Sequence, residues 1–141
     1  MSLDLFLFLA GDAPLNTDRL NEAAQKFNPI AVYERNVDLG THSGFLPVIL
    51  DGRETGVETY KISYSELAEY LPPNEDIDPE NTIVIQFRWG GDANEGATAL
   101  YTAALYSATY QGVAFDPMSN MYLGADQLMQ GFEAFFNLGS R

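Results

Sequence analysis

The chain has 141 residues, and its 46% hydrophobic and 13% aromatic content is that of a globular protein the size of one domain. Its formal net charge of −13, from 20 acidic and 7 basic side chains, excludes direct nucleic-acid binding, disfavours anionic membranes and favours a basic partner. The chain contains no cysteine, which excludes disulfides, thiolate catalysis and cysteine zinc sites and is compatible with a reducing compartment.

The first predicted element is a buried strand over residues 3–10, a short apolar run that ends at a turn. The run is too short for a signal peptide or a membrane span, and Asp4 precedes it where a signal peptide has basic residues. We therefore expect a cytoplasmic protein. A helix with one apolar stripe follows over residues 17–27, and Asn28-Pro29 ends it.

A β-hairpin is predicted next, after a strand near residues 30–35 and a loop that contains glycine and serine. The strands 45–50 and 57–62 flank the turn-forming segment 51–56, which indicates a connection longer than the tightest hairpin turn. Side chains alternate along 57–62, so this strand should have one face toward water. A short helix is expected over 65–71.

The second half of the chain contains the clearest strand and the longest helix. Residues 72–81 read as a polar surface loop, and the β-branched run 82–87 as a strand. The helix predicted over 92–110 is rich in alanine and leucine and carries no charge after Glu95. Because it is apolar nearly all round, we expect a central, buried helix. Gly112 is predicted to end it as the residue just beyond the helix.

A short strand over 113–115 and a helix over 125–137 complete the predicted elements. Five to six strands and about three packed helices, without repeats or linkers, predict an α+β fold. The sheet is expected to be antiparallel or mixed. We treat residues 1–141 as a single domain.

The sequence offers little for catalysis. The single histidine, His42, stands beside Ser43, but neighbouring residues on a strand or loop point apart and do not form a nucleophile–base pair. No G-x-S-x-G segment is present to display a nucleophile. We therefore predict no catalytic residue, no cofactor and no partner for the His42 imidazole. A small hydrolase that uses carboxylates or His42 remains the alternative.

A strand–glycine–helix junction stands before the long helix, formed by Arg88, Gly90, Gly91, Asp92 and Glu95. Such a junction can bind phosphate at a helix N-terminus, but no Lys-Ser/Thr follows, and Asp92 would repel the anion. Acids here are expected to cap the helix rather than to work as a catalytic pair. We expect Gly91 to let the helix pack close to the strand. Arg88 should pair with Asp92 or Glu95.

The most informative charge pattern is the acidic stretch over residues 66–80, which contains no basic residue. It lacks the ligand spacing of a calcium loop, and we predict no metal site in it. Acidic side chains beside tyrosines suit a docking face for a basic protein, although plain solvated surface is the alternative. The predicted partner-binding residues are Tyr64, Glu66, Glu69, Tyr70, Glu75, Asp76, Asp78 and Glu80.

Three groups of residues follow one another along the chain: Ser43-Gly44-Phe45-Leu46-Pro47 with Gly56-Val57-Glu58, Arg88-Trp89-Gly90-Gly91-Asp92-x-x-Glu95, and Phe115-Asp116-Pro117. In this order they resemble the small immunity proteins of bacterial toxin–immunity systems, which accompany contact-dependent and secreted polymorphic toxins. The resemblance implies a cytoplasmic inhibitor that blocks one cognate toxin by tight binding, and it implies no catalytic residues. Many such toxins are nucleases with basic clefts, in agreement with the acidic charge. A structural or adaptor module is a further alternative, and the oligomeric state stays open.

Overall fold

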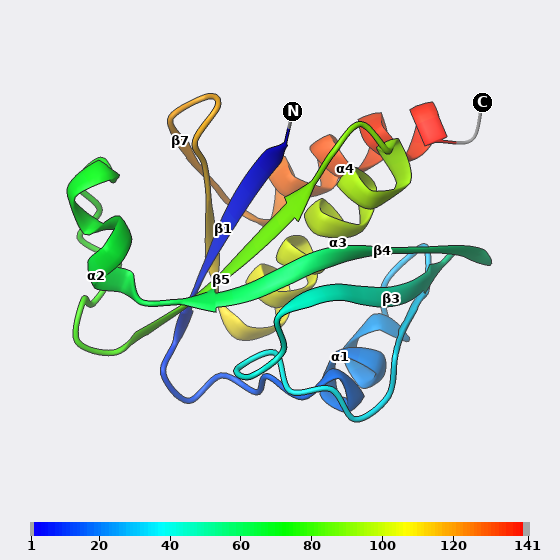
Figure 1. Cartoon of the computed structure of the whole chain (residues 1–141), viewed down its shortest axis with the longest axis horizontal. Coiled ribbons are helices and arrows are strands. Elements are labelled where there is room, and N and C mark those ends of the chain that lie inside the picture. Colours follow the sequence, from blue (N-terminus) through cyan, green and yellow to red (C-terminus); the bar gives the residue numbers. More distant parts are fainter. Residues whose placement is uncertain (1, 140–141) are drawn as a thin grey trace.

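The computed structural model describes residues 2–139, which form an antiparallel sheet with three helices packed on one of its faces (Figure 1). The strands are β1 (Leu3–Ala10), β2 (Ala31–Tyr33), β3 (Gly44–Leu50), β4 (Arg53–Ile62), β5 (Thr82–Trp89), β6 (Val113–Asp116) and β7 (Met121–Leu123). The helices are α1 (Thr17–Ala24), α2 (Tyr64–Leu67), the 3-10 turn η1 (Ala68–Tyr70), α3 (Ala93–Tyr110) and α4 (Ala125–Gly139). The strands lie in the order β2-β3-β4-β5-β1-β6-β7.

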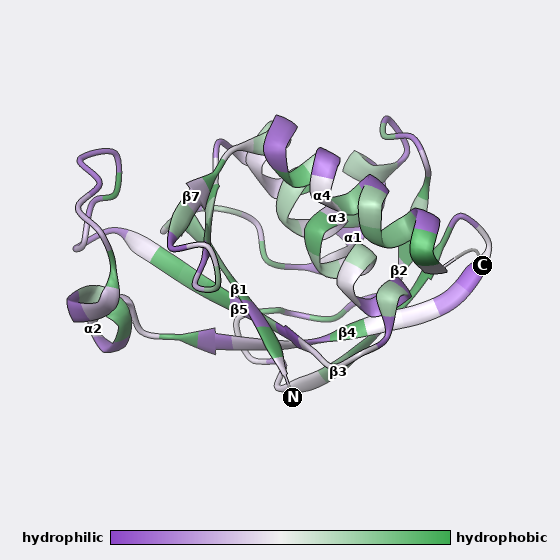
Figure 2. Ribbon diagram, turned by 90° about the horizontal axis from the view of Figure 1, so that it is seen from above, coloured by the Kyte–Doolittle hydropathy of each residue, from purple (hydrophilic) through white to green (hydrophobic). Residues whose placement is uncertain are grey.

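The predicted α+β class is confirmed, and every pair of neighbouring strands is antiparallel. The counts differ from the prediction, because residues 2–139 contain seven strands and four α-helices. The strand that the sequence did not reveal is β7, whose three residues are too few to show an alternating pattern. Helices α1, α3 and α4 lie on one side of the sheet (Figure 2), and we call the opposite side the outer face.

The β3–β4 hairpin is tighter than predicted. Only Asp51 and Gly52 connect the strands, with φ angles of 51° and 79°. Two consecutive positive φ values give the mirror-image turn that matches the twist of the strands, and an Asp-Gly pair tolerates them. Residues 53–56, which were predicted as part of the turn, therefore belong to β4. Glycine is needed at position 56, because a Cβ there would collide with the carbonyl oxygen of Leu46 and the ring of Phe45.

Helix α3 forms the centre of the core, as predicted. Asp92 caps its start, because the Asp92 carboxylate accepts hydrogen bonds from the backbone N–H of Asn94 at 2.8 Å and of Glu95 at 3.3 Å. Every residue from 96 to 107 is buried, between the sheet and the other two helices of the layer. No helix within residues 2–139 combines the length and the apolar character that spanning a membrane requires.

Two glycine predictions at the ends of α3 are wrong. Gln111, with a φ of 58°, is the left-handed residue that ends the helix, and Gly112 instead lies so close to β1 that a Cβ would meet Leu9 at 2.8 Å. At the other end, a Cβ on Gly91 would meet nothing within 4 Å, so Gly91 does not bring the helix close to the strand. Gly96 does so, because a Cβ there would meet the rings of Trp89 and Phe135.

Candidate functional site

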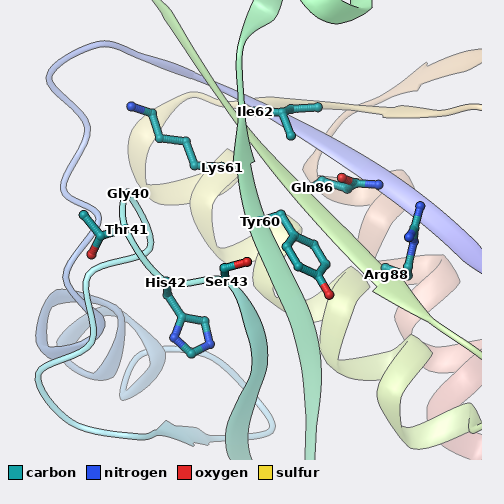
Figure 3. A pocket seen from close by; sticks show the side chains of 9 residues that line it. All are labelled: Gly40, Thr41, His42, Ser43, Tyr60, Lys61, Ile62, Gln86 and Arg88. Atoms are coloured by element: carbon teal, nitrogen blue, oxygen red, sulfur yellow. The ribbon is translucent and has the colours of Figure 1, made fainter.

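The outer face of the sheet is covered at one end only. The strand register places Glu58 opposite Arg88 and Tyr60 opposite Gln86. The side chains of Tyr60, Gln86 and Arg88 lie on the side of the sheet away from the helices (Figure 3), and Glu58 shares this side because Tyr60 bonds it. Val57 and Thr59, which alternate with Glu58 and Tyr60 on β4, are buried on the side of α3, whereas Lys61, the next residue of that series, is exposed. The centre of the outer face is therefore a row of polar groups open to solvent.

Hydrogen bonds join the groups of this row. Arg88 Nε donates to Asp4 Oδ1 at 3.0 Å, and Gln86 Nε2 donates to the same oxygen at 2.9 Å. The hydrogen bond between Arg88 and Asp4, together with the negative charge of Asp4, raises the pKa of Arg88. The predicted pairing of Arg88 with Asp92 or Glu95 is wrong, because β1 runs beside β5 and places Asp4 directly opposite Arg88.

A pocket of about 370 Å³ opens beside the polar row (Figure 3). The His42 imidazole does have a partner, contrary to the prediction, because its Nε2 lies 3.0 Å from the backbone oxygen of Phe45. In Figure 3 the ring is not directed at the Tyr60 hydroxyl or at Arg88, and Tyr60 instead donates its hydroxyl hydrogen to Glu58 at 2.5 Å. The residues that line the pocket are Gly40, Thr41, His42, Ser43, Tyr60, Lys61, Ile62, Gln86 and Arg88.

His42→Ala is expected to cost stability and to leave the biological activity of the protein unchanged. The substitution removes a bond that ties the loop before β3 to that strand, and a bond of this kind contributes about 1 kcal/mol. Thermal melting should show a fall in Tm of a few degrees, and an assay of the biological activity should give the same value as for the parent. A folded His42→Ala protein that had lost its biological activity would revive the hydrolase alternative.

The carboxylates of Asp92 and Glu95 at the start of α3 lie near enough to influence each other's charge. Partial burial raises the pKa of Glu95, and the nearby charges of Asp92 and Glu58 add to this effect. Asp92 occupies the free N–H groups of the helix start with its own carboxylate, so a phosphate would find them already bonded. Neither Asp92 nor Glu95 lines the His42 pocket. Within residues 2–139, no cluster of three histidine or acidic side chains is placed to hold a metal ion.

Residues 63–81, which contain α2, η1 and the loop that follows, cover the other end of the outer face and are called the acidic arm here (Figure 1). The arm is anchored by a second hydrophobic core. Ile77 is buried there, and Leu67 and Leu71 pack against the same core, which includes Phe8 and Val84.

Two aromatic residues strengthen this attachment. The Tyr64 ring packs edge-on against Phe8, with 6.0 Å between ring centroids, and the Tyr122 hydroxyl donates to the backbone oxygen of Pro72 at 2.7 Å. The arm is therefore a fixed feature of the surface. Tyr64 is half-buried, and its ring packs between the arm and this core. The Tyr70 side chain, in contrast, is 70% exposed.

All six acids of the arm are exposed, and none forms a salt bridge within residues 2–139. The Asp78 carboxylate has a local role, because it accepts a hydrogen bond from the Glu80 backbone N–H. The predicted partner-binding residues therefore do share one segment, with Tyr64 as the member that faces the core. The exposed acids are Glu66, Glu69, Glu75, Asp76, Asp78 and Glu80.

The arm and the open sheet face are thus the two surfaces from which function can be argued. The arm presents negative charge on a fixed scaffold, and the central row presents polar groups that are already bonded to one another. Comparisons with protein families, with curated proteins and with solved structures find no match for this chain.

Proposed function

We propose that this protein binds a basic protein partner through the acidic arm, as an immunity protein that neutralises a bacterial toxin. The observation that carries the proposal is the presentation of six exposed carboxylates, without a basic neighbour in the segment, on an arm that is anchored to a second core. The immunity role comes from the resemblance of the motifs, and the basic partner comes from the charge.

The physical argument for a partner begins with the anchoring. Ile77 and its neighbours fix the arm before any partner arrives, so binding does not have to order a flexible loop. A fixed negative surface accelerates the approach of a basic protein and favours one orientation of docking. Exposed Tyr70 adds a large side chain of the type that dominates binding energy in interfaces.

The same charges oppose one another in the free protein. Glu75, Asp76 and Asp78 lie within four residues of chain, and no lysine or arginine pairs with them in the part of the chain that the structure describes. Lysine or arginine side chains of a partner would replace this repulsion with attraction. Solubility alone requires net charge but no particular arrangement of it.

Charge reversal on the arm tests the proposal. We expect Glu69→Lys, Glu75→Lys and Asp76→Lys together to abolish capture of a basic protein from a lysate of the source cell. Asp78 is left unchanged because its carboxylate holds the turn at Glu80. The matched control reverses exposed acids on α1 and α4, namely Glu22, Asp126 and Glu133.

The parent and the control variant should retain the partner equally, and the arm variant should lose it. Retention of the same partner by all three proteins would contradict a role for the arm. The captured protein then tests the immunity role. Its production should be toxic to cells unless the parent chain is made with it, and a partner without toxicity would contradict that role while leaving the binding role standing.

A further inference from the structure

The uncovered end of the outer face carries a group of exposed apolar side chains, called the apolar patch here. It consists of Ile30, Val32, Phe45, Pro47 and Ile49, on and beside β2 and β3. Val32 lies directly opposite Ile49 in the strand register, and their exposed fractions are 50% and 45%. Val32, Pro47 and Ile49 also line a pocket of about 530 Å³. Contiguous apolar surface of this kind marks interaction sites more often than isolated apolar side chains do.

A partner can contact the apolar patch from the outer face of the sheet, but it cannot bind there by adding a strand to the sheet edge. β2 is the edge strand, but the Asn21 carboxamide on α1 bonds both polar groups of Tyr33, at 2.7 Å to its N–H and 3.1 Å to its C=O. The Tyr101 hydroxyl donates to the backbone oxygen of Pro29 just before the strand. These bonds occupy the groups that an added strand would need. A partner must therefore lay side chains onto the patch.

The charges around the patch indicate which side chains those are. Glu34 and Glu54 line the same pocket as Ile49, both are exposed, and neither forms an ion pair within residues 2–139. Arg35 is the single basic residue of the pocket lining. A second copy of this chain would bring the same carboxylates and a further charge of −13 to the contact. A partner with lysine or arginine beside its apolar side chain would instead meet complementary charge.

The patch and the arm also lie within reach of one partner. β4 runs from Glu54 at the patch to Ile62 at the arm, a span of about 26 Å at roughly 3.3 Å per residue. A standard interface covers about 800 Å² on each partner, which is about 28 Å across. One protein seated on the outer face can therefore contact both ends.

We infer that the apolar patch is a second docking site, which takes a large apolar side chain flanked by lysine or arginine from the basic partner. This inference rests on the proposed function for the identity of the partner. It differs in mechanism, because the arm accelerates association and the patch slows dissociation.

The test uses a defined probe, a short synthetic peptide with a Leu-Trp-Leu centre and two lysines on each side. We expect its addition to ¹⁵N-labelled protein to shift the amide signals of Val32 and Ile49. The double variant Val32→Ser and Ile49→Ser should weaken peptide binding by about fivefold or more, because each serine removes apolar contact area. Leu138→Ser, an exposed apolar position on α4, is the matched control and should leave binding unchanged.

Two further peptides separate the contributions. Glutamates in place of the lysines should abolish binding, and serines in place of the apolar centre should do the same. The arm variant should bind the lysine peptide as the parent does at about 150 mM salt, where the Debye length is about 8 Å. Peptide binding therefore tests the apolar patch alone, and its outcome does not depend on whether the acidic arm binds a partner. Equal binding of the glutamate peptide, or shifts confined to other residues, would overturn the inference. A dimer of the parent that the Val32 and Ile49 variant dissociates would also overturn it, in favour of a second copy.

Discussion

Leu105→Asp is expected to unfold the protein. Leu105 is fully buried in the middle of α3, among residues that are buried without interruption from 96 to 107. A carboxylate there has no basic partner and must either remain charged in apolar surroundings or bind a proton, and either outcome costs more than about 4 kcal/mol. A protein of ordinary stability has only about 5–15 kcal/mol to lose.

Circular dichroism and thermal melting would measure this effect. Leu100→Asp should act in the same direction, since Leu100 is also buried. Ala108→Asp is the control, because Ala108 lies on the same helix but is exposed, and it should lower stability by about 1 kcal/mol or less. If Leu105→Asp and Leu100→Asp melted like the parent, α3 would not be the centre of the core.

Ile77→Asp is expected to release the acidic arm while the rest of the fold stays intact. Ile77 is the buried residue that the arm contributes to the second core, and loss of a buried isoleucine costs about 2–4 kcal/mol. The main core contains α3 and does not include Ile77, so the loss should fall on the arm alone.

Hydrogen exchange would locate the change. The backbone bonds of the arm, such as Ile77 N–H to Asn74 and Asn81 N–H to Asp78, should open more often, by roughly 100-fold for about 2.7 kcal/mol. The amides of α3 should exchange as in the parent. Ala68→Asp adds the same charge at an exposed position of the arm and is the control. Equal loss of protection in α3 would show that the arm is not a separate unit.

Strong local patterns allowed the main elements to be predicted. β1 was predicted with its observed bounds because it is an uninterrupted apolar run between turn signals, and α3 because it is long and carries almost no charge. The hairpin turn was misplaced because residues 53–56 are polar or glycine, which resembles a loop although they continue β4. Local composition identifies the kind of element better than its ends.

The features that depend on distant pairing could not be predicted. Arg88 bonds Asp4, which is 84 residues away and comes opposite it only when β1 adds to β5. The exposure of Phe45 and Ile49 was hidden because β3 is apolar on both faces and shows no alternation. Residues 72–81 were predicted as a polar surface loop, and no attachment of the acidic arm to the sheet was predicted, yet the apolar residues Leu67, Leu71 and Ile77 were the available signal of a second core.

The central claim is that the acidic arm steers a basic partner onto the protein. Its direct test is the association rate of the purified partner with immobilised parent, arm variant and control variant at two salt concentrations. We predict that the parent and the control variant both associate rapidly at low salt. The association rates of both should decrease by the same factor as salt rises, since the Debye length falls from about 30 Å at 0.01 M to about 8 Å at 0.15 M. The arm variant should associate slowly at both concentrations. An association rate that is indifferent both to salt and to reversal of Glu69, Glu75 and Asp76 would contradict the claim.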